Sequence, residues 1–199
     1  PELGAIGFRI DNYYTGANDA TSWDYPPGCR PDRGFAATRF VGAGHALRRS
    51  AFEAVGAYDE RLFFCGEELD LSYRMLDAGY RIAYVPEVGI RHKVAPAQRV
   101  QWGRGRYYYT VRNSLYSAWK FGTPLPRLLL GAAAFTVRGW RNGIPLAALR
   151  GVVDAVGMCR DYRRTLLNSA GGGGGGAGAP RAGTLSSATW RYIRQCEPT

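Results

Sequence analysis

The hydrophobic pattern of this 199-residue sequence changes near residue 98, and that change limits the fold more than any single motif does. Before residue 98, short apolar segments alternate with short amphipathic ones, and turn-forming residues separate them. Beyond it, longer segments repeat apolar residues with the 3.6-residue period of a helix. The first half therefore predicts an α/β fold, in which helices cover a sheet, and the second half predicts amphipathic helices.

Short strands and helices are expected in alternation over the first half. The strands are expected at residues 5–10, 81–85 and 88–92, with another beginning at Phe40, and the helices at 51–55 and 67–78. Ser50 and Glu53 fit the two capping-box positions of the first helix. Pro86 is expected to end a strand, and residues 11–36, which have no clean period, predict a long loop.

Three longer helices are expected in the second half, at residues 98–121, 126–139 and 145–167. A glycine-rich segment at 168–185 cannot pack against a core and predicts a flexible linker. A short basic helix is expected at 186–195. No run of residues reaches the roughly 18 to 20 apolar positions that a membrane-spanning helix needs.

The charge of the chain follows the same division. Residues 1–97 carry 11 Lys or Arg against 13 Asp or Glu, whereas residues 98–199 carry 15 against 3. A mixed first half and a cationic second half suggest chemistry in the first and an anionic partner for the second. Three interpretations of the arginines stay open: solvated helix faces, a nucleic-acid surface, or a surface that lies on anionic lipid.

The cysteines and the N-terminus indicate which metal sites, which thiol state and which kind of chain to expect. Cys29, Cys65, Cys159 and Cys196 form no CxxC pair, which argues against a structural zinc site. Scattered single cysteines in a chain without a visible signal peptide favour reduced thiols. Because the sequence does not begin with Met, we expect it to be part of a longer chain.

The segment FFCGEELDLSYR, at residues 63–74, places three carboxylates at the expected start of a helix. The helix dipole stabilises a carboxylate there by roughly 0.3 to 1 kcal/mol, which explains one of them. Adjacent carboxylates such as Glu67 and Glu68 repel each other, so capping explains the second less well. A carboxylate poised beside an apolar segment suits a general base, and both interpretations stay open.

His92 is the second candidate for chemistry, and it lies 24 residues after Glu68. A helix followed by a returning strand can bring the two close together. A single histidine is often an ordinary surface or core residue. As a metal ligand it would need further donors beside it.

Several motifs follow one another in a characteristic order. They are GAG at 42–44 with two arginines at 48–49, VGAYDE at 55–60, FFCGEELDLSYR at 63–74, AGYRIAYVP at 78–86, the closing His92, and YYYTVRN at 107–113. This order resembles the second half of the catalytic domain of inverting family 2 glycosyltransferases of the GT-A fold. The resemblance covers about residues 1–95 and the helix that follows.

The resemblance implies a role for each acid of the cluster. Glu68 would be the base that deprotonates the acceptor hydroxyl, with Glu67 before it. The family usually has aspartate at the second position, so the glutamate reaches one methylene further. Asp70 would hold the acceptor or orient the site, and His92 would bind a Mg²⁺ or Mn²⁺ ion.

The resemblance also implies binding residues outside the acid cluster. Gly42 and Gly44 would let the backbone approach a sugar or a diphosphate closely. Arg112 and Asn113 would reach the diphosphate of an acceptor. The nucleotide-binding half of such enzymes, with its Asp-x-Asp motif, has no counterpart in this sequence, so we expect these 199 residues alone to lack transfer activity.

The resulting organisation has four segments. Residues 1–97 would form the acceptor-side half of a partial GT-A (Rossmann-like) domain, 98–167 a basic helical extension with membrane association as a candidate role, 168–185 the flexible linker, and 186–199 a segment with a short helix. The expected partners are a nucleotide-sugar donor, a glycan or lipid-linked acceptor, and an anionic membrane surface.

The expected function is sugar transfer with inversion to a cell-envelope polysaccharide or lipid-linked acceptor. It would take place in the cytoplasm, on the inner face of the cell membrane, and without nucleic acid. Rhamnose, galactofuranose and glucose all stay open as donor sugars. The alternative is a non-enzymatic basic module that binds nucleic acid or anionic membrane, in which Glu67 and Glu68 only cap a helix.

Overall fold

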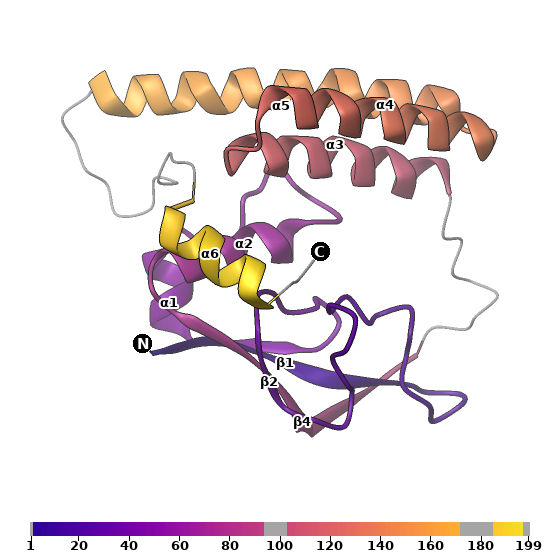
Figure 1. Ribbon diagram of the computed structural model, residues 1–199, viewed down its shortest axis with the longest axis vertical. Helices are drawn as coiled ribbons and strands as arrows, with labels where there is room; N and C mark the ends of the chain where they lie inside the picture. The colour runs from indigo at the N-terminus through magenta and orange to yellow at the C-terminus, as the bar shows by residue number, and fades with distance from the viewer. Residues whose placement is uncertain (1, 94–102, 172–184, 197–199) are drawn as a thin grey trace. The chain divides into compact units, whose positions relative to one another are not determined.

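The chain forms two compact units in the computed structural model, which describes residues 2–93, 103–171 and 185–196, with only the backbone at 169–171. The first unit takes its residues from 1–58, 68–99 and 185–199, and the second from 59–67 and 100–184 (Figure 1). These limits differ from the sequence-based boundaries at 97 and 185. Residues 59–67 group with the helices that follow them, and the last helix groups with the sheet.

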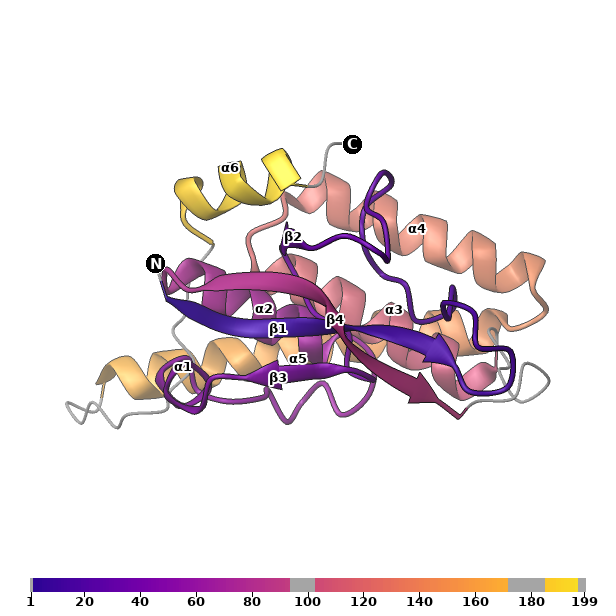
Figure 2. The same ribbon diagram turned by 90° about the horizontal axis from the view of Figure 1, so that it is seen from below.

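A four-stranded sheet forms the base of the first unit, in the order β2-β4-β1-β3 (Figure 2). The central strands, β1 (Leu3–Asn12) and β4 (Arg81–His92), run parallel. At the edges, β3 (His45–Leu47) is antiparallel to β1, and β2 (Phe35–Ala37) is antiparallel to β4. Parallel strands joined through helices are the hallmark of an α/β unit, so the predicted α/β class with a partial Rossmann-like sheet is confirmed.

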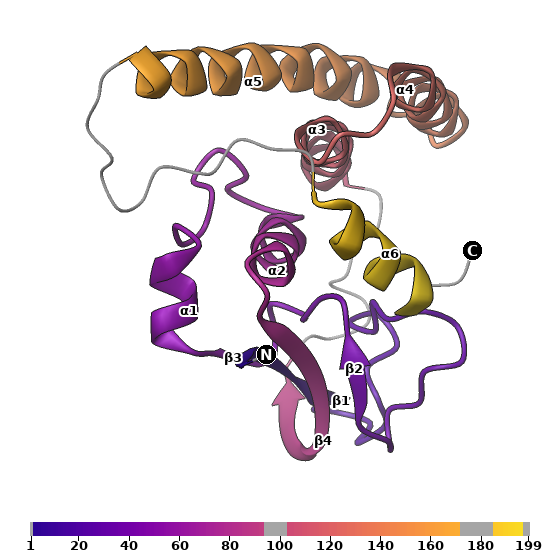
Figure 3. The ribbon, with the colours of Figure 1, turned by 60° about the vertical axis from the view of Figure 1, so that its left-hand side comes forward.

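Three helices lie on one face of this sheet, as Figure 3 shows: α1 (Arg49–Ala54), α2 (Glu67–Asp77) and α6 (Ser187–Cys196). Asp77 joins the last two helices, because its Oδ1 accepts hydrogen bonds from Ser186 N at 2.8 Å and Thr189 Oγ1 at 2.9 Å. Ser186 also caps α6 through its Oγ, which accepts the Thr189 N–H at 3.1 Å. The predicted C-terminal helix is confirmed. Its place beside α2 was not predicted from the sequence.

Pro86 does not end a strand, because β4 continues past it through an irregularity. β1 and β4 pair as far as Val85, and the next paired residue of β4 is Gly89. Proline lacks a backbone N–H and is tolerated where a strand bulges out of its ladder. The two strands expected at 81–85 and 88–92 are therefore one strand with a bulge between its two halves.

Two further expectations about the first half are wrong. Ser50 is not a cap, because α1 begins at Arg49 and Ser50 lies inside the first turn. Glu53 accepts a hydrogen bond from Arg49 Nε at 2.8 Å instead of completing a capping box. Phe40 lies outside the strands. It is buried and stacks on His45, where β3 begins.

Three helices form most of the second unit: α3 (Arg104–Lys120), α4 (Leu125–Arg141) and α5 (Pro145–Gly171). The three predicted long helices are confirmed, although residues 98–102 of the first lie outside the described residues. α5 continues to Gly171, so the start of the segment expected as a linker is helical.

Two apolar clusters hold these helices together. The first contains Tyr107, Val111, Ile144 and Ala148, and the second contains Leu62, Tyr116 and Tyr162. The helices pack closely enough to require glycine at two positions. A Cβ on Gly139 would lie 2.6 Å from Ala148 Cβ, and one on Gly151 would lie 2.9 Å from Val111 Cβ.

A buried ion pair fastens residues 59–67 to α3. Asp59 Oδ2 accepts hydrogen bonds from Lys120 Nζ at 2.9 Å and from Tyr116 Oη at 2.8 Å. Burial alone raises the pKa of Asp59, but the positive charge of Lys120 and these two hydrogen bonds outweigh it and hold that pKa at about 2. The carboxylate is therefore ionised at neutral pH and neutralises a lysine that is itself almost fully buried.

We expect Asp59→Ala to lower the free energy of unfolding by about 3–5 kcal/mol, because the buried Lys120 ammonium loses this carboxylate. Urea denaturation followed by circular dichroism measures the change. The control is Asp161→Ala, since Asp161 is exposed and pairs with Arg164 at 3.8 Å. Its effect should stay within about 0.5 kcal/mol.

The effect of Asp59→Ala should also depend on pH. Because the folded-state pKa lies below the ordinary value of 3.8, the carboxylate stabilises the fold fully above about pH 4 and loses this contribution as the pH falls through about 2. The difference in stability between wild type and variant should therefore shrink over that window. A difference that stays constant down to pH 2 would contradict the role of the ionised pair.

Candidate active site

The predicted site residues fall into both units. The first unit holds Gly42, Gly44, Glu68, Asp70 and His92, and the second holds Glu67 and Arg112. Glu67 and Glu68 are the first two residues of α2, and both are half-buried. The unpaired N–H groups and the dipole at a helix N-terminus favour negative charge at this place.

The segment that leads into α2 has a strained backbone. Phe63, Cys65 and Gly66 have φ angles of 48°, 68° and 101°, all in the left-handed region. For a residue other than glycine this region costs on the order of 1–3 kcal/mol, and the strain persists only where neighbouring groups enforce it. Residues of this kind cluster at functional sites, which agrees with the chemistry expected for the acids that follow.

Glu68 lies directly on the glycine turn at 42–44. A Cβ on Gly42 would collide with Glu68 Oε1 and lie 2.9 Å from Glu68 Cδ. The missing side chain therefore makes room for the carboxylate. The structure brings two predicted site residues together, and the close approach that Gly42 permits is to Glu68.

Gly44 serves the packing of the sheet. A Cβ there would lie 3.1 Å from Ile10 Cγ1 and from Ile90 Cγ1. Its carbonyl accepts the Phe8 N–H at 2.9 Å, which holds the turn against β1. These contacts explain why residue 44 is a glycine, and contact with a substrate stays a prediction.

Asp70 is completely buried and forms an ion pair with Arg74, at 2.7 Å from Nη2. The same guanidinium donates to the carbonyls of Val55 at 2.5 Å and Ala57 at 2.6 Å. Asp70 thus fixes an arginine that ties α2 to the turn after α1. This gives the orienting role of Asp70 a physical basis, whereas contact with an acceptor stays a prediction.

His92 lies at the end of β4, against a carboxylate that the sequence did not single out. Its Nδ1 is 3.1 Å from Asp19 Oδ2 and 3.3 Å from Ser22 Oγ. Burial raises the pKa of Asp19, but hydrogen bonds from Thr21, Ser22 and His92 outweigh it and leave the pKa well below its usual range. An ionised Asp19 therefore accepts a hydrogen bond from the Nδ1–H group of His92 and fixes the orientation of the ring.

Sequence reasoning missed Asp19 because it lies in a segment without a period. The Thr21 N–H donates to Asp19 Oδ1 at 3.1 Å, an Asx turn that the local sequence could have indicated. The histidine partner could not have been found this way. It depends on the pairing of Asn12 with His92 across two strands that are distant in sequence.

The donor set around His92 fits part of a divalent metal site. Histidine ligands of metals usually pass their other ring N–H to a carboxylate, as His92 does to Asp19. Within residues 2–93, 103–171 and 185–196, no three His, Cys, Asp or Glu side chains gather closely enough to hold a metal ion. The described residues therefore supply one oriented imidazole and not a complete coordination shell.

Two predicted site residues belong to the second unit. Glu67 Oε2 is buried and accepts no hydrogen bond within the described part of the chain. Arg112 donates from Nε to Asn113 Oδ1 at 2.8 Å and from Nη2 to the carbonyl of Arg61 at 2.9 Å, and it lies over the Tyr109 ring at 4.8 Å. Its guanidinium therefore already supports the segment before α2, and contact with a diphosphate stays a prediction.

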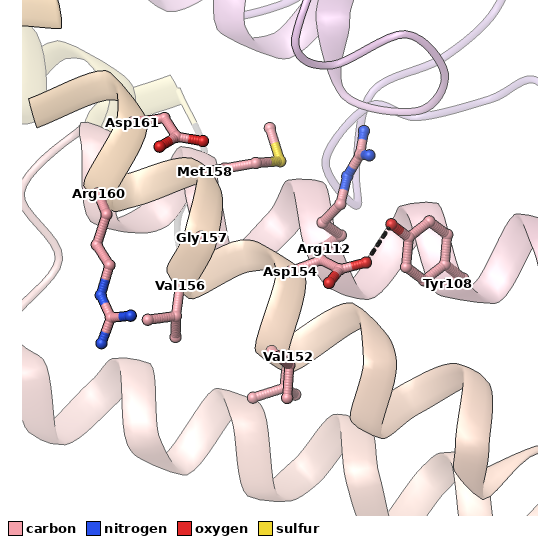
Figure 4. Close-up of a pocket in the computed structure, with 10 residues that line it drawn as sticks. Tyr108, Arg112, Val152, Asp154, Val156, Gly157, Met158, Arg160 and Asp161 are labelled. Carbon is pink, nitrogen blue, oxygen red and sulfur yellow. Dashed lines mark hydrogen bonds between the residues drawn. The ribbon is translucent and has the colours of Figure 1, made fainter. Parts of the chain in front are cut away.

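Arg112 also borders a shallow depression of about 660 Å³ between α3 and α5 (Figure 4). Tyr108 closes one side by donating a hydrogen bond to Asp154 Oδ2 at 2.7 Å. Valine and methionine side chains of α5 line much of the rest.

Comparison with known proteins supports the glycosyltransferase family that the sequence resembles. A model of the family described as "Glycosyl transferase family group 2" matches residues 14–153. A stretch of 67 residues is 40% identical to the O-antigen chain rhamnosyltransferase WbaN of Salmonella anatum, and it covers 33% of this chain and 20% of that protein.

A second stretch, of 49 residues, is 45% identical to the N-acetylglucosaminyl-diphospho-decaprenol L-rhamnosyltransferase of Mycobacterium tuberculosis, strains CDC 1551 and H37Rv. It covers 25% of this chain and 16% of the relative. The chain thus matches a fifth or less of the length of these relatives. Because the family match spans well over half of the chain, the protein belongs to glycosyl transferase family group 2.

Proposed function

We propose that this chain is the acceptor-side part of an inverting glycosyltransferase in which Glu68 is the general base. The observation that carries the proposal is the Glu68 carboxylate, which lies on the turn at Gly42 and at the start of α2. It falls inside the region that matches the family. The resemblance noted in the sequence assigns the base to the same position.

The reaction requires one base and no covalent nucleophile. Glu68 takes the proton of an acceptor hydroxyl while its oxygen forms a bond to the anomeric carbon of a nucleotide sugar. The bond to the nucleotide diphosphate breaks on the opposite side, so the configuration inverts and the leaving group carries the electron pair. The helix N-terminus favours the ionised carboxylate, and Glu67 lies beside it in the chain.

We propose a rhamnosyl donor and a lipid-linked diphosphate acceptor. Both relatives are named as rhamnosyltransferases, and the mycobacterial one is named for a sugar linked to diphospho-decaprenol. Arg112 is the residue of the second unit proposed for the acceptor diphosphate, because guanidinium groups pair well with phosphate. The alternative of a non-enzymatic basic module gains no support from the family match.

We also propose that His92 is a ligand of a Mg²⁺ or Mn²⁺ ion, with its orientation fixed by Asp19. Such an ion would neutralise charge on the departing diphosphate. The contribution of this chain is an imidazole whose Nδ1 lies 3.1 Å from Asp19 Oδ2, and a carboxylate partner of this kind is typical of histidines that bind metals.

Asp19→Asn in the full-length enzyme should weaken Mn²⁺ binding by about 10- to 100-fold, because it removes the carboxylate that orients His92. Electron paramagnetic resonance of free Mn²⁺ measures the affinity without turnover. Asp24→Asn is the matched control, since Asp24 is an exposed acid of the same loop. Equal Mn²⁺ affinity in wild type and Asp19→Asn would refute the orienting role.

Glu68→Gln should lower kcat of the full-length enzyme by about 10²- to 10⁴-fold with little change in substrate KM, since the amide cannot accept the proton. Gly42→Ala should lower kcat as well, because its Cβ displaces the flexible end of Glu68 while the fold stays intact. Ala43→Ser, at the exposed neighbour, is the control. Normal transfer rates in Glu68→Gln would mean that another group is the base.

A second proposal concerns α4 and an anionic membrane. One side of this helix is apolar and exposed: Leu125, Pro126, Leu129, Leu130, Ala133, Val137 and Trp140, the last 75% exposed. Arg127, Arg138 and Arg141 follow along one edge of that side. In the described chain no helix is both long and apolar enough to cross a bilayer.

This pattern suits a helix that lies in the lipid headgroup region, with apolar residues facing the acyl chains and arginines facing lipid phosphates. The cytoplasmic leaflet carries the anionic lipids that complement these arginines, so we propose that α4 lies on that leaflet. The enzyme could then reach an acceptor that stays anchored in the same membrane.

The full-length enzyme should float with vesicles that contain anionic phosphatidylglycerol, and much less with neutral phosphatidylcholine vesicles. Leu130→Asp combined with Trp140→Ala should reduce the bound fraction at least about tenfold, because two exposed apolar groups no longer enter the interface. Val88→Asp, at an exposed apolar residue of the sheet, is the control. Undiminished flotation of the double variant would rule out α4 as the contact.

A further inference from the structure

The loop between Leu62 and Glu67 exposes an aromatic ring at the cost of backbone strain. Phe63 is 78% exposed and has a φ of 48°. A bulky residue avoids this conformation, and an apolar ring avoids water. The observed loop satisfies neither preference, so contacts with neighbouring residues must hold it in this conformation.

Asn113 of α3 holds it. This side chain is 1% exposed, and its Nδ2 donates at 2.7 Å to each of the carbonyls of Leu62, Phe64 and Cys65. These carbonyls flank Phe63 on both sides. Nδ2 has two hydrogens for these three acceptors, so two of the carbonyls share one hydrogen. The three contacts hold the loop in one conformation, and Arg112 Nε fixes the amide oxygen at 2.8 Å.

The clamped loop builds an aromatic platform, defined here as Phe63, Phe64 and Tyr109. The Phe63 and Phe64 rings lie 5.6 Å and 6.0 Å from the Tyr109 ring. Arg112 lies over Tyr109 at 4.8 Å and Arg106 lies over Phe64 at 6.0 Å. Two exposed rings and the half-buried Tyr109 ring are thus bordered by two guanidinium groups. The loop ends at Glu67, whose Oε2 has no hydrogen-bond partner among the described residues.

We infer that the aromatic platform binds the sugar ring of a glycosyl diphosphate acceptor, an inference that rests on the proposed function. The C–H face of a sugar ring is apolar and can cover the exposed Phe63 ring. The diphosphate attached to that sugar carries negative charge, which matches the two arginines at the border. No other ligand class in the proposed reaction joins an apolar ring face to a diphosphate on the acceptor side.

The platform is therefore a specificity element for the acceptor. Asn113 positions the platform and does not itself contact the sugar, because its amide hydrogens already bind the carbonyls of the loop. Phe63 supplies the contact surface, and the left-handed backbone sets the direction in which the ring points. A glycine at residue 63 would keep this backbone and remove only the ring.

The test is direct binding to the full-length enzyme without donor, measured by isothermal titration calorimetry. The two probes are N-acetylglucosaminyl diphosphate on a short prenyl chain and the same prenyl diphosphate without sugar. Wild type should bind the first at least about tenfold more tightly, because the sugar would bury the exposed Phe63 ring. Phe63→Gly should abolish that preference, and Phe63→Trp should retain it.

Two results would overturn the inference. A preference that survives in Phe63→Gly would show that the sugar lies elsewhere. Equal weakening of both probes in Phe63→Gly would show that the platform holds the prenyl chain and not the sugar. Thermal unfolding distinguishes these results from misfolding. Phe63→Gly relieves the strain of a positive φ, which offsets the greater flexibility of glycine in the unfolded chain, so the melting temperature should change little.

The inference and the proposed function fail in different ways. Glu68→Gln should keep the full preference for the sugar-bearing probe while it loses turnover. Turnover that survives in Glu68→Gln contradicts the proposed base but leaves the platform intact. Normal acceptor KM in Phe63→Gly, together with normal probe binding, contradicts the platform but leaves the base intact.

Discussion

The parallel pairing of β1 with β4 is the constraint on which the geometry of the first unit depends. It places Asn12 opposite His92 and lets the Tyr13 N–H donate to the His92 carbonyl at 3.0 Å. The chain after β1 then folds back through the bridge between Asp11 and Asn18, which carries Asp19 to the histidine. A shift of register by one residue would turn His92 to the other face of the sheet and separate it from its carboxylate.

α2 carries both a buried ion pair and the Glu68 carboxylate. Its buried side carries Asp70, which fixes Arg74 and thereby the carbonyls of Val55 and Ala57. Its first turn carries Glu68, which lies on the turn at Gly42. The buried ion pair fixes the helix, so the position of the Glu68 carboxylate is set by packed structure, which suits the base proposed for this position.

The sequence allowed the α/β class, the long helices and the family to be predicted, because these depend on periodicity and on motifs of adjacent residues. It did not allow Pro86 to be placed in a bulge or Ser50 inside a helix, because backbone pairing and helix length overrode the local preference of each residue. The contacts of Asp19 with His92, and of Asn113 with the loop before α2, join residues far apart in sequence. No local pattern contains them, and the strain at Phe63 becomes visible only in φ.

The length of Glu68 and the absence of a side chain at residue 42 are best understood together. A glutamate extends one methylene further from its helix than the aspartate usual in related enzymes. Here that extra length ends against the backbone of Gly42, where a Cβ would occupy the same space as Oε1. The turn therefore limits how far the longer side chain can reach and restricts its rotamers, which gives a flexible glutamate a defined position. The turn at Gly42 thus confines the longer Glu68 side chain, and a glutamate in place of the usual aspartate is compatible with a base at this position.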